Sequence, residues 1–435
     1  MALNFLVNFY HCWDVCENST SLGKHMTKRL LLSSIVIVVV VVLTLVYCQS
    51  KGSTDGRREC VDANTRGTRS VSTLQFVIVV ARHGNRGPLS TFTTIPYQSN
   101  DTSVWPYGVG ELTQIGRVQM YKLGEKVRSM YNGFLDSTYR PRDFQALSSP
   151  STRTLQSAEL FLAGLFPPTG FQVWNQDMCW QPIPIYPSSL DHYEILDYAA
   201  ETSCPRFSEP QKDSLQEINR LYQSSLTSFV DYVIPHTGID VMDVMQKIGS
   251  LYKLRVVAIV WETLKYVADN ELPLPDWATK IYPEPLNNLF SKIFKAIVAG
   301  STDQIKYLEG ELFQELVGLM QAKANNTLSP DRRMYYYSGH DYTIMGLLAM
   351  LNPQREAYVN PGSALIYELH QNPSTGQFTV QVLYIDGKSP DLNPQDIDIV
   401  GCESPCDFHK MLEITEKYYN ISNWKEECHL GPTIS

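Results

Sequence analysis

Two arginines and one histidine stand within five consecutive residues, at Arg82, His83 and Arg86. Each guanidinium presents a planar fork of N–H donors that matches a tetrahedral oxyanion such as phosphate. A neutral imidazole between two such forks is a candidate nucleophile toward phosphorus. The alternative interpretation is a solvated basic turn, so the elements around these residues must decide between the two.

The segment before this turn, residues 76–81, is apolar and largely β-branched, with no polar residue inside it. Such a run predicts a strand that is buried on both faces. Ligands of open α/β sheets bind at the carboxyl ends of the strands, which is where the turn stands. Gly84 allows the backbone to approach a ligand closely, and Pro88 ends the strand ladder. The pattern therefore favours a binding site.

Two further turns between a predicted strand and a predicted helix carry residues of matching chemistry. Arg153 follows the strand at 144–147, just inside a helix start, and His340 and Asp341 follow the strand at 333–337. Taken singly, Arg153 could pair with a carboxylate, His340 could be structural, and Asp341 could be an ordinary N-cap. If the three strands are parallel and adjacent, however, their turns converge on one pocket.

The remaining periodicity predicts the fold class. An amphipathic helix is expected at 113–130, and strands are expected at 364–370 and 378–386. Residues 210–320 are mostly helical in pattern. Recurring strand, loop and helix units indicate an α/β fold: a doubly wound, mixed and mostly parallel sheet with flanking helices. A smaller helical subdomain is expected at roughly 180–325.

An almost unbroken apolar run at 30–47 dominates the N-terminal part of the chain. It predicts either a transmembrane signal anchor or the apolar region of a signal peptide. Translation from Met1 favours the anchor, and translation from Met26 favours the cleaved signal. The expected organisation is a polar leader at 1–29, the apolar segment at 30–48, a flexible linker at 51–72 and one folded domain at 73–435.

Cysteines and glycosylation sequons agree with a lumenal or extracellular location. Six of the nine cysteines lie downstream of the apolar run, and an even number there favours disulfides over metal ligands. Asn100, Asn325 and Asn420 begin Asn-x-Ser/Thr triplets, which are glycosylation acceptors in secreted chains.

The overall charge limits the classes of partner. The formal net charge is −9 and the pI is near 5.5. A nucleic-acid-binding protein would need an extended basic face, so this class is disfavoured.

Several motifs together resemble the histidine acid phosphatases, a branch of the histidine phosphatase superfamily that includes lysosomal, prostatic and insect venom acid phosphatases and phytases. The resemblance runs from about Gln75 to Cys428. It is carried by the segments at 82–88, 112–116, 153–155, 180–184, 204–207 and 340–341.

The resemblance implies a role for each polar residue of the three turns. His83 would attack phosphorus and become a phosphohistidine, and Asp341 would protonate the leaving alcohol. The phosphate oxygens would be held by Arg82, Arg86, Arg153 and His340. Neither a metal nor another cofactor is expected.

The resemblance also implies disulfides between Cys204 and Cys428 and between Cys402 and Cys406. Cys60 and Cys179 are then left over, either bridged to each other or free. The chain departs from several relatives at Asn85, where they carry Asp, so a negative charge beside the phosphate is absent.

The sequence as a whole predicts a secreted or lumenal enzyme that hydrolyses small phosphate monoesters at acidic pH. A lysosomal location and a homodimer are compatible with this prediction. The alternatives are a catalytically silent binding protein of the same fold and a phytase-like inositol phosphate phosphatase. The segment at 90–107 holds no Lys or Arg, which disfavours the highly charged phytate as substrate.

Overall fold

A computed structural model describes residues 67–190, 192–196, 204–355 and 358–429. The leader at 1–29, the apolar segment at 30–48, most of the expected linker and Cys60 lie outside these residues. Within the described ranges, no helix combines the length and the apolar character needed to cross a bilayer.

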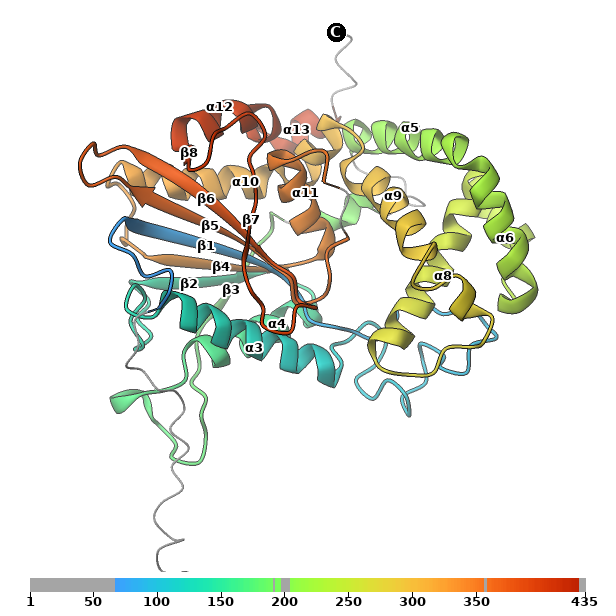
Figure 1. The fold of residues 1–435 in the computed structure, drawn as a ribbon, viewed down its shortest axis with the longest axis horizontal. Coiled ribbons are helices and arrows are strands. Elements are labelled where there is room, and N and C mark those ends of the chain that lie inside the picture. Colours follow the sequence, from blue (N-terminus) through green and yellow to red (C-terminus); the bar gives the residue numbers. More distant parts are fainter. Residues whose placement is uncertain (1–66, 191, 197–203, 356–357, 430–435) are drawn as a thin grey trace, which may run out of the picture. The chain divides into compact units, whose positions relative to one another are not determined.

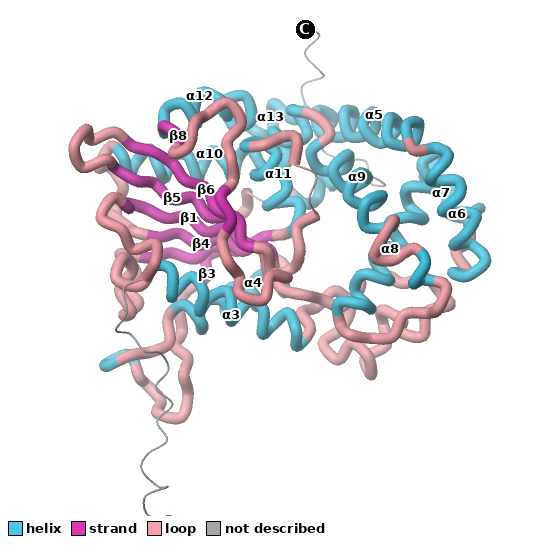
Figure 2. The backbone as a smooth tube through the Cα atoms, viewed as in Figure 1, coloured by secondary structure: helices cyan, strands magenta, loops and turns pink. Residues whose placement is uncertain are grey.

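One mixed sheet forms the centre of the fold, in the order β3-β2-β4-β1-β5-β6-β7, with β8 paired to β6 (Figures 1 and 2). The first four strands of this order are parallel, and β5, β6 and β7 run antiparallel to their neighbours. The predicted mixed, mostly parallel sheet is confirmed. The strands are β1 (Leu74–Arg82), β2 (Phe144–Ser148), β3 (Ile185–Pro187), β4 (Met334–Gly339), β5 (Ala364–Gln371), β6 (Phe378–Ile385), β7 (Gln395–Asp396) and β8 (Cys406–Asp407).

Strand β1 lies in the interior of the sheet because its side chains are apolar on both faces. Phe76, Ile78 and Val80 belong to one hydrophobic core, whereas Val77 and Val79 belong to the other, and all five are fully buried. Burial of each such side chain contributes about 1.5–3 kcal/mol. This accounts for the continuous apolar run, since a strand with one solvated face would alternate with polar residues.

Helices cover both faces of the sheet. Figure 1 shows α3 and α4 on one side and α10, α11 and α12 on the other. Helices α5 and α13 lie near α10 and α12, and the Cys204–Cys428 disulfide connects the start of α5 to α13. The bounds are α3 (Gln114–Tyr131), α4 (Thr152–Leu165), α5 (Pro205–Leu221), α10 (Thr302–Ala324), α11 (Asp341–Leu351), α12 (Phe408–Tyr419) and α13 (Trp424–His429).

A second group of helices packs around its own hydrophobic core, apart from the sheet. Figure 1 shows them beyond the carboxyl end of β1. They are α6 (Gln223–Thr237), α8 (Tyr252–Asp269) and α9 (Leu286–Ala299), and the short α7 (Val241–Ile248) packs against α8 with no fully buried side chain of its own. The loop at 88–113 packs against this group through Phe92, Ile95 and Trp105. These helices stand at the edge of the sheet where the three turns end. They form a smaller unit than the helical subdomain expected at roughly 180–325, because β3 pairs with β2 in the sheet and α10 packs against the core that lies under β1.

Residues 67–72 are part of the folded unit, although their polar composition suggests a linker. Arg69 forms an ion pair with Glu368, which is fully buried in β5, and the Tyr131 hydroxyl donates to the same carboxylate at 2.6 Å. A buried carboxylate requires such partners, and Arg69 supplies one from outside the predicted domain boundary.

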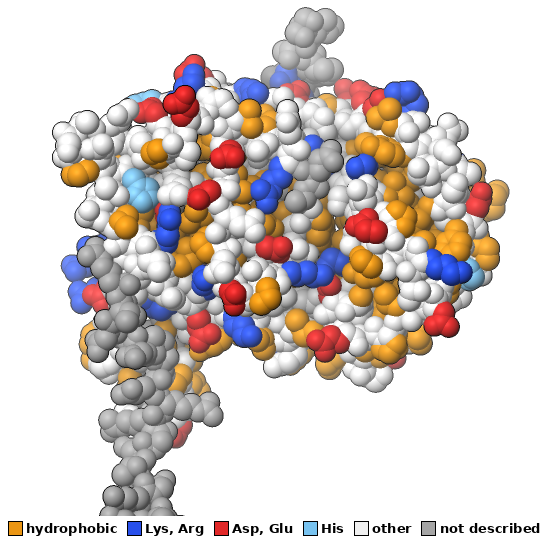
Figure 3. Space-filling view, viewed as in Figure 1, with side chains coloured by type: hydrophobic (Ala, Val, Ile, Leu, Met, Phe, Trp, Pro, Cys, Tyr) orange, Lys and Arg blue, Asp and Glu red, His pale blue; other side chains and the backbone are white. Residues whose placement is uncertain are grey.

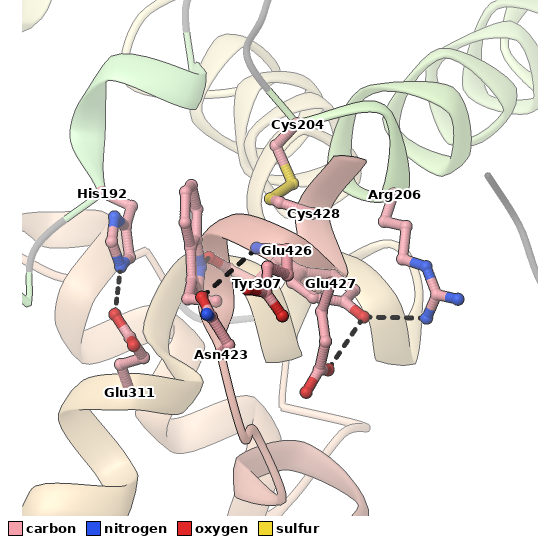
Figure 4. The surroundings of a disulfide bond; sticks show 10 residues. His192, Cys204, Arg206, Tyr307, Glu311, Asn423, Glu426, Glu427 and Cys428 are labelled. Atoms are coloured by element: carbon pink, nitrogen blue, oxygen red, sulfur yellow. Dashed lines mark hydrogen bonds and ion pairs between the residues drawn. A yellow bond between two sulfur atoms is a disulfide. The ribbon is translucent and has the colours of Figure 1, made fainter. Parts of the chain in front are cut away.

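The structure contains both disulfides that the family resemblance implies. Cys204 precedes α5 and bonds to Cys428 in α13 (Figure 4). Cys402 bonds to Cys406 just before α12. Cys179 is also disulfide-bonded, with a partner other than these four cysteines. The alternative of a free Cys179 is therefore wrong.

The start of α3 packs directly on the backbone of the Arg82–Pro88 turn. A Cβ atom added to Gly116 would lie 2.0 Å from the carbonyl oxygen of Asn85, and one added to Gly84 would lie 2.3 Å from that of Gly116. Two glycines thus bring the helix and the turn to a distance that no other residue type permits.

We predict that Gly116→Ala destabilises the protein by about 1–3 kcal/mol, because backbone must move to admit the methyl group. Gly318→Ala is the matched control. Gly318 is exposed within α10, and a Cβ there meets nothing within 4 Å. The control is expected to stabilise the protein by about 0.5–1 kcal/mol. Denaturant unfolding measures both changes, and a Gly116→Ala protein as stable as wild type would contradict the packing.

Candidate active site

The three turns meet at one edge of the sheet, as the sequence predicts. Strand β4 lies between β1 and β2 and is parallel to both, with Arg82 in register with Gly339 and Ser148 in register with Ser338. His83 is held from both sides, since its amide donates to Gly339 and its carbonyl accepts from Gly362. All the predicted phosphate-site residues therefore lie at this edge.

His83 is buried, with 2% of its surface exposed. Its Nδ1 lies 2.8 Å from the Gly84 carbonyl oxygen, which can only accept, so Nδ1 carries the proton. Burial lowers the pKa of His83 well below its ordinary value, and the positive charges of Arg82 and Arg153 lower it further. The imidazole is therefore neutral, and its Nε2 holds a free lone pair for nucleophilic attack.

Arg82 is completely buried and nearly saturated with hydrogen bonds. Its Nη1 donates to Tyr358 Oη at 2.7 Å and to the Val359 carbonyl, while Nη2 donates to Tyr266 Oη at 3.0 Å and pairs with Asp341 at 2.8 Å. Burial alone would lower the pKa of Arg82, but the Asp341 carboxylate and the hydroxyls of Tyr358 and Tyr266 together outweigh burial, so the net pKa is raised. Arg82 is a fixed cation.

Arg86 is held by a carboxylate that the sequence alone does not reveal. Its Nη1 and Nη2 lie 2.7 and 3.2 Å from the two oxygens of Glu262, and its guanidinium carbon lies 4.1 Å from the centre of the Tyr266 ring. Glu262 and Tyr266 both come from α8. The helical subdomain thus supplies one wall of the site.

Arg153 and His340 contact each other, and the His340 ring lies close to that of His83. Arg153 Nη2 lies 3.4 Å from His340 Nδ1, and His340 Nε2 lies 3.0 Å from Ser149 Oγ. Because arginine can only donate, Nδ1 is the acceptor and Nε2 carries the proton. Burial, followed by the charge of Arg153, lowers the pKa of His340 to about 3. The rings of His83 and His340 lie 5.4 Å apart.

Asp341 is ionised in this arrangement. Burial acts to raise the pKa of its carboxyl group, but Arg82 and then Arg86 outweigh burial, and the net pKa lies below the ordinary value. Three guanidiniums therefore face two carboxylates, those of Asp341 and Glu262, while both histidines are neutral. The excess of positive charge favours an anionic ligand.

Asn85 takes part in the packing of the Arg82–Pro88 turn. Its Oδ1 accepts from Thr113 Oγ1 at 2.7 Å, and its backbone amide donates to Gln119 Oε1 at 2.9 Å. The Asn85 side chain thus connects the turn to the N-cap of α3, its backbone amide connects the turn to the helix itself, and neither adds a charge to the site.

A pocket of about 340 Å³ lies alongside the turn at Gly87. Aromatic and aliphatic side chains dominate its lining, and no Lys or Arg occurs among the residues that form it. These side chains include Val104, Trp105, Tyr107, Leu112, Ile115 and Leu272. The pocket has room for the apolar part of a small molecule.

The fold and this geometry together define a site built to bind an oxyanion and to present a nucleophilic imidazole to it. The chain belongs to the histidine phosphatase superfamily (branch 2), whose model matches residues 73–385.

Relatives and solved structures agree with that assignment. Lysosomal acid phosphatase of Homo sapiens is 31% identical over 361 residues, covering 82% of this chain and 81% of the relative. Prostatic acid phosphatase of Bos taurus is 29% identical, covering 82% and 87%. The fold is similar to that of Hafnia alvei phytase in complex with tartrate, with a TM-score of 0.61 at 18% identity, covering 82% of this chain and 98% of that one.

The buried, neutral His340 makes folding stability depend on pH. Its pKa is about 3 in the folded state and about 6.5 when unfolded, so below pH 6.5 the unfolded chain takes up a proton that the folded chain does not. Stability is therefore lost as the pH falls, and His340 accounts for about 2 kcal/mol of the loss between pH 7.5 and pH 5.

We predict that His340→Asn loses about 2 kcal/mol less stability than wild type between these two pH values. Urea unfolding at both pH values measures the difference. His409→Asn, at an exposed position on α12, is the control and should behave as wild type. An identical pH dependence in wild type and His340→Asn would show that His340 is not held neutral.

Proposed function

We propose that this protein hydrolyses phosphate monoesters at acidic pH through a phosphohistidine intermediate on His83. The observation that carries the proposal is the unprotonated His83 Nε2 among the guanidiniums of Arg82, Arg86 and Arg153. Membership of the histidine phosphatase superfamily supports the same reaction.

In the first step, Nε2 of His83 attacks phosphorus in line with the ester oxygen. The new P–N bond forms as the P–O bond to the alcohol breaks. Arg82, Arg86 and Arg153 would hold the phosphate oxygens and stabilise the charge that they carry in the transition state, and His340 would join them by turning its Nε2–H from Ser149 Oγ to a phosphate oxygen. Because all of these groups are already held by the protein, they need little reorganisation during the reaction.

Asp341 donates the proton that the leaving alkoxide requires. Its carboxyl group is ionised in the empty site, so the proton must arrive with the substrate. The second pKa of a phosphate monoester is about 6, and in acid the monoanion brings this proton into the site. Asp341 then takes it from the phosphate and passes it to the alcohol. In the second step Asp341 removes a proton from water as the water attacks phosphorus, which releases phosphate and restores His83.

We predict that His83→Ala abolishes release of the alcohol from a chromogenic phosphate ester at pH 5, because the variant has no nucleophile. Wild type is expected to keep its activity in EDTA, since guanidiniums hold the phosphate. Equal activity in wild type and variant would refute the mechanism and the role of His83. Activity lost to EDTA would indicate a metal-dependent reaction instead.

We predict that Asp341→Asn slows hydrolysis of alkyl phosphates by about 10²–10⁴-fold, because a basic alkoxide leaves only when it is protonated. Aryl phosphates release an acidic phenol as phenolate without that help, so their hydrolysis should slow far less. The measurement is kcat for a series of esters that differ in the pKa of the alcohol. A loss that is independent of the leaving group would assign Asp341 another role.

The two alternatives are weaker. A silent binding protein would not need an unprotonated imidazole nitrogen among three guanidiniums, one of them paired with a carboxylate, yet this arrangement is present. A phytase must bind many phosphate groups, and the pocket beside Gly87 is lined without Lys or Arg. Small monoesters with an uncharged alcohol fit this pocket better.

We also propose a secreted or lumenal location, with residues 30–48 acting as signal anchor or signal peptide. The disulfides support it, and two relatives are named lysosomal and prostatic acid phosphatases. Asn100, Asn325 and Asn420 are all exposed and are proposed glycosylation sites.

A homodimer is the protein partnership that we propose. The segment from Phe171 to Tyr186 leads into β3, which ends the sheet, and it exposes several large apolar side chains: Phe171, Trp174, Met178, Trp180 and Tyr186. Such patches are typical of protein interfaces. We propose no nucleic-acid partner, because acidic and basic side chains are interspersed on the face in Figure 3.

A further inference from the structure

The hydrogen bonds of Arg86 leave one defined edge of its guanidinium available. Nη1 uses both of its N–H groups, on the Gly87 carbonyl at 2.9 Å and on Glu262 Oε1 at 2.7 Å. Nη2 uses one, on Glu262 Oε2 at 3.2 Å. A guanidinium has five N–H groups, so two remain, on Nε and Nη2, with no acceptor among the described residues.

The two remaining N–H groups lie on the same edge of the planar guanidinium. Together they form a side-on fork that can bind two oxygens of one phosphate group. Arg82 differs, because all four of its terminal N–H groups already have acceptors. Arg86 therefore keeps a complete fork that Arg82 lacks, and the direction of this fork depends on how the protein orients the guanidinium.

Glu262 fixes that orientation. Its carboxylate meets the guanidinium with both oxygens, and Oε1 also accepts from the Leu89 amide at 2.8 Å. The side chains of Arg86 and Glu262 are only 8% and 15% exposed, so water competes weakly for either. The Tyr266 ring lies below the guanidinium at 4.1 Å and restricts its plane.

We infer that Glu262 is a positioning residue for phosphoryl transfer, which acts through Arg86 and directs the free fork at the phosphate. This inference rests on the proposed function for its kinetic part. Glu262 stands on α8, 176 residues from Arg86 in sequence. The helical subdomain is thus needed for the geometry of the site as well as for its outer wall.

The decisive experiment is a double-mutant cycle on the full-length protein with Glu262→Gln and Arg86→Lys. Glutamine keeps the size of the side chain but removes its charge and one acceptor. Glu262→Gln is expected to lower kcat by about 10–100-fold, since small misplacements of a catalytic group have effects of this size. KM should change less than kcat, because Arg86 keeps its charge. In the Arg86→Lys background, which has no fork, Glu262→Gln should change kcat less than about threefold.

Inorganic vanadate is the binding probe, because it mimics the five-coordinate phosphorus and needs no turnover. Calorimetry should show weaker vanadate binding to Glu262→Gln by a factor similar to its loss in kcat. Glu262→Asp keeps the charge with a shorter side chain. It should fold as wild type and still bind vanadate more weakly, so the inference can be tested even if the glutamine variant fails to fold. Glu217→Gln, which breaks an exposed ion pair on α5, is the control.

The outcomes separate the inference from the proposed function. If both Glu262 variants bind vanadate as tightly as wild type, or if the effects of Glu262→Gln and Arg86→Lys on kcat are fully additive, the positioning role of Glu262 is refuted and the proposed function is untouched. A wild-type protein that binds vanadate but hydrolyses no ester would refute the proposed function, while weaker vanadate binding in the variants would still support Glu262. A wild-type protein that binds no vanadate would refute both.

Discussion

The arrangement of β1 beside β4 is the constraint on which the site depends. Arg82 and His83 come at the end of one strand, and His340 and Asp341 come at the end of the other. Parallel pairing in register brings these ends together. A shift of one residue would turn every side chain of β1 to the opposite face and would expose apolar residues that now fill two cores. The stability of the sheet and the geometry of the site are thus set by the same register.

Several arginines can be buried together only because the protein supplies partners for them. Asp341 and the hydroxyls of Tyr266 and Tyr358 hold Arg82, and Glu262 holds Arg86. Removing one partner from a buried ion pair leaves an uncompensated charge and is strongly destabilising. Positive charge is therefore concentrated around His83 without loss of the fold. Burial, together with this charge, lowers the pKa of His83 and keeps the imidazole neutral and nucleophilic in acid.

Much of this site can be predicted from sequence because its residues stand next to local signals. The apolar run at 76–81 and the turn after it show where Arg82 and His83 lie. The starts of two predicted helices likewise show where Arg153 and Asp341 lie. Glu262, Tyr266 and Tyr358 have no such signal, since the residues they contact are far away in sequence. The sequence places Arg69 in a linker for the same reason, since its partner, Glu368, lies 299 residues away. What the sequence indicates for residues 1–66 stays a prediction.

The most direct test of the account is to trap the phosphoenzyme. Wild type and His83→Ala would be mixed with a ³²P-labelled phosphate ester at pH 5 and quenched in alkali, in which phosphohistidine survives. If His83 is the nucleophile, the label appears on wild type alone, lies in the peptide that contains His83 and is lost on mild acid treatment. Hydrolysis by wild type without any label, or label on a different residue, would contradict it.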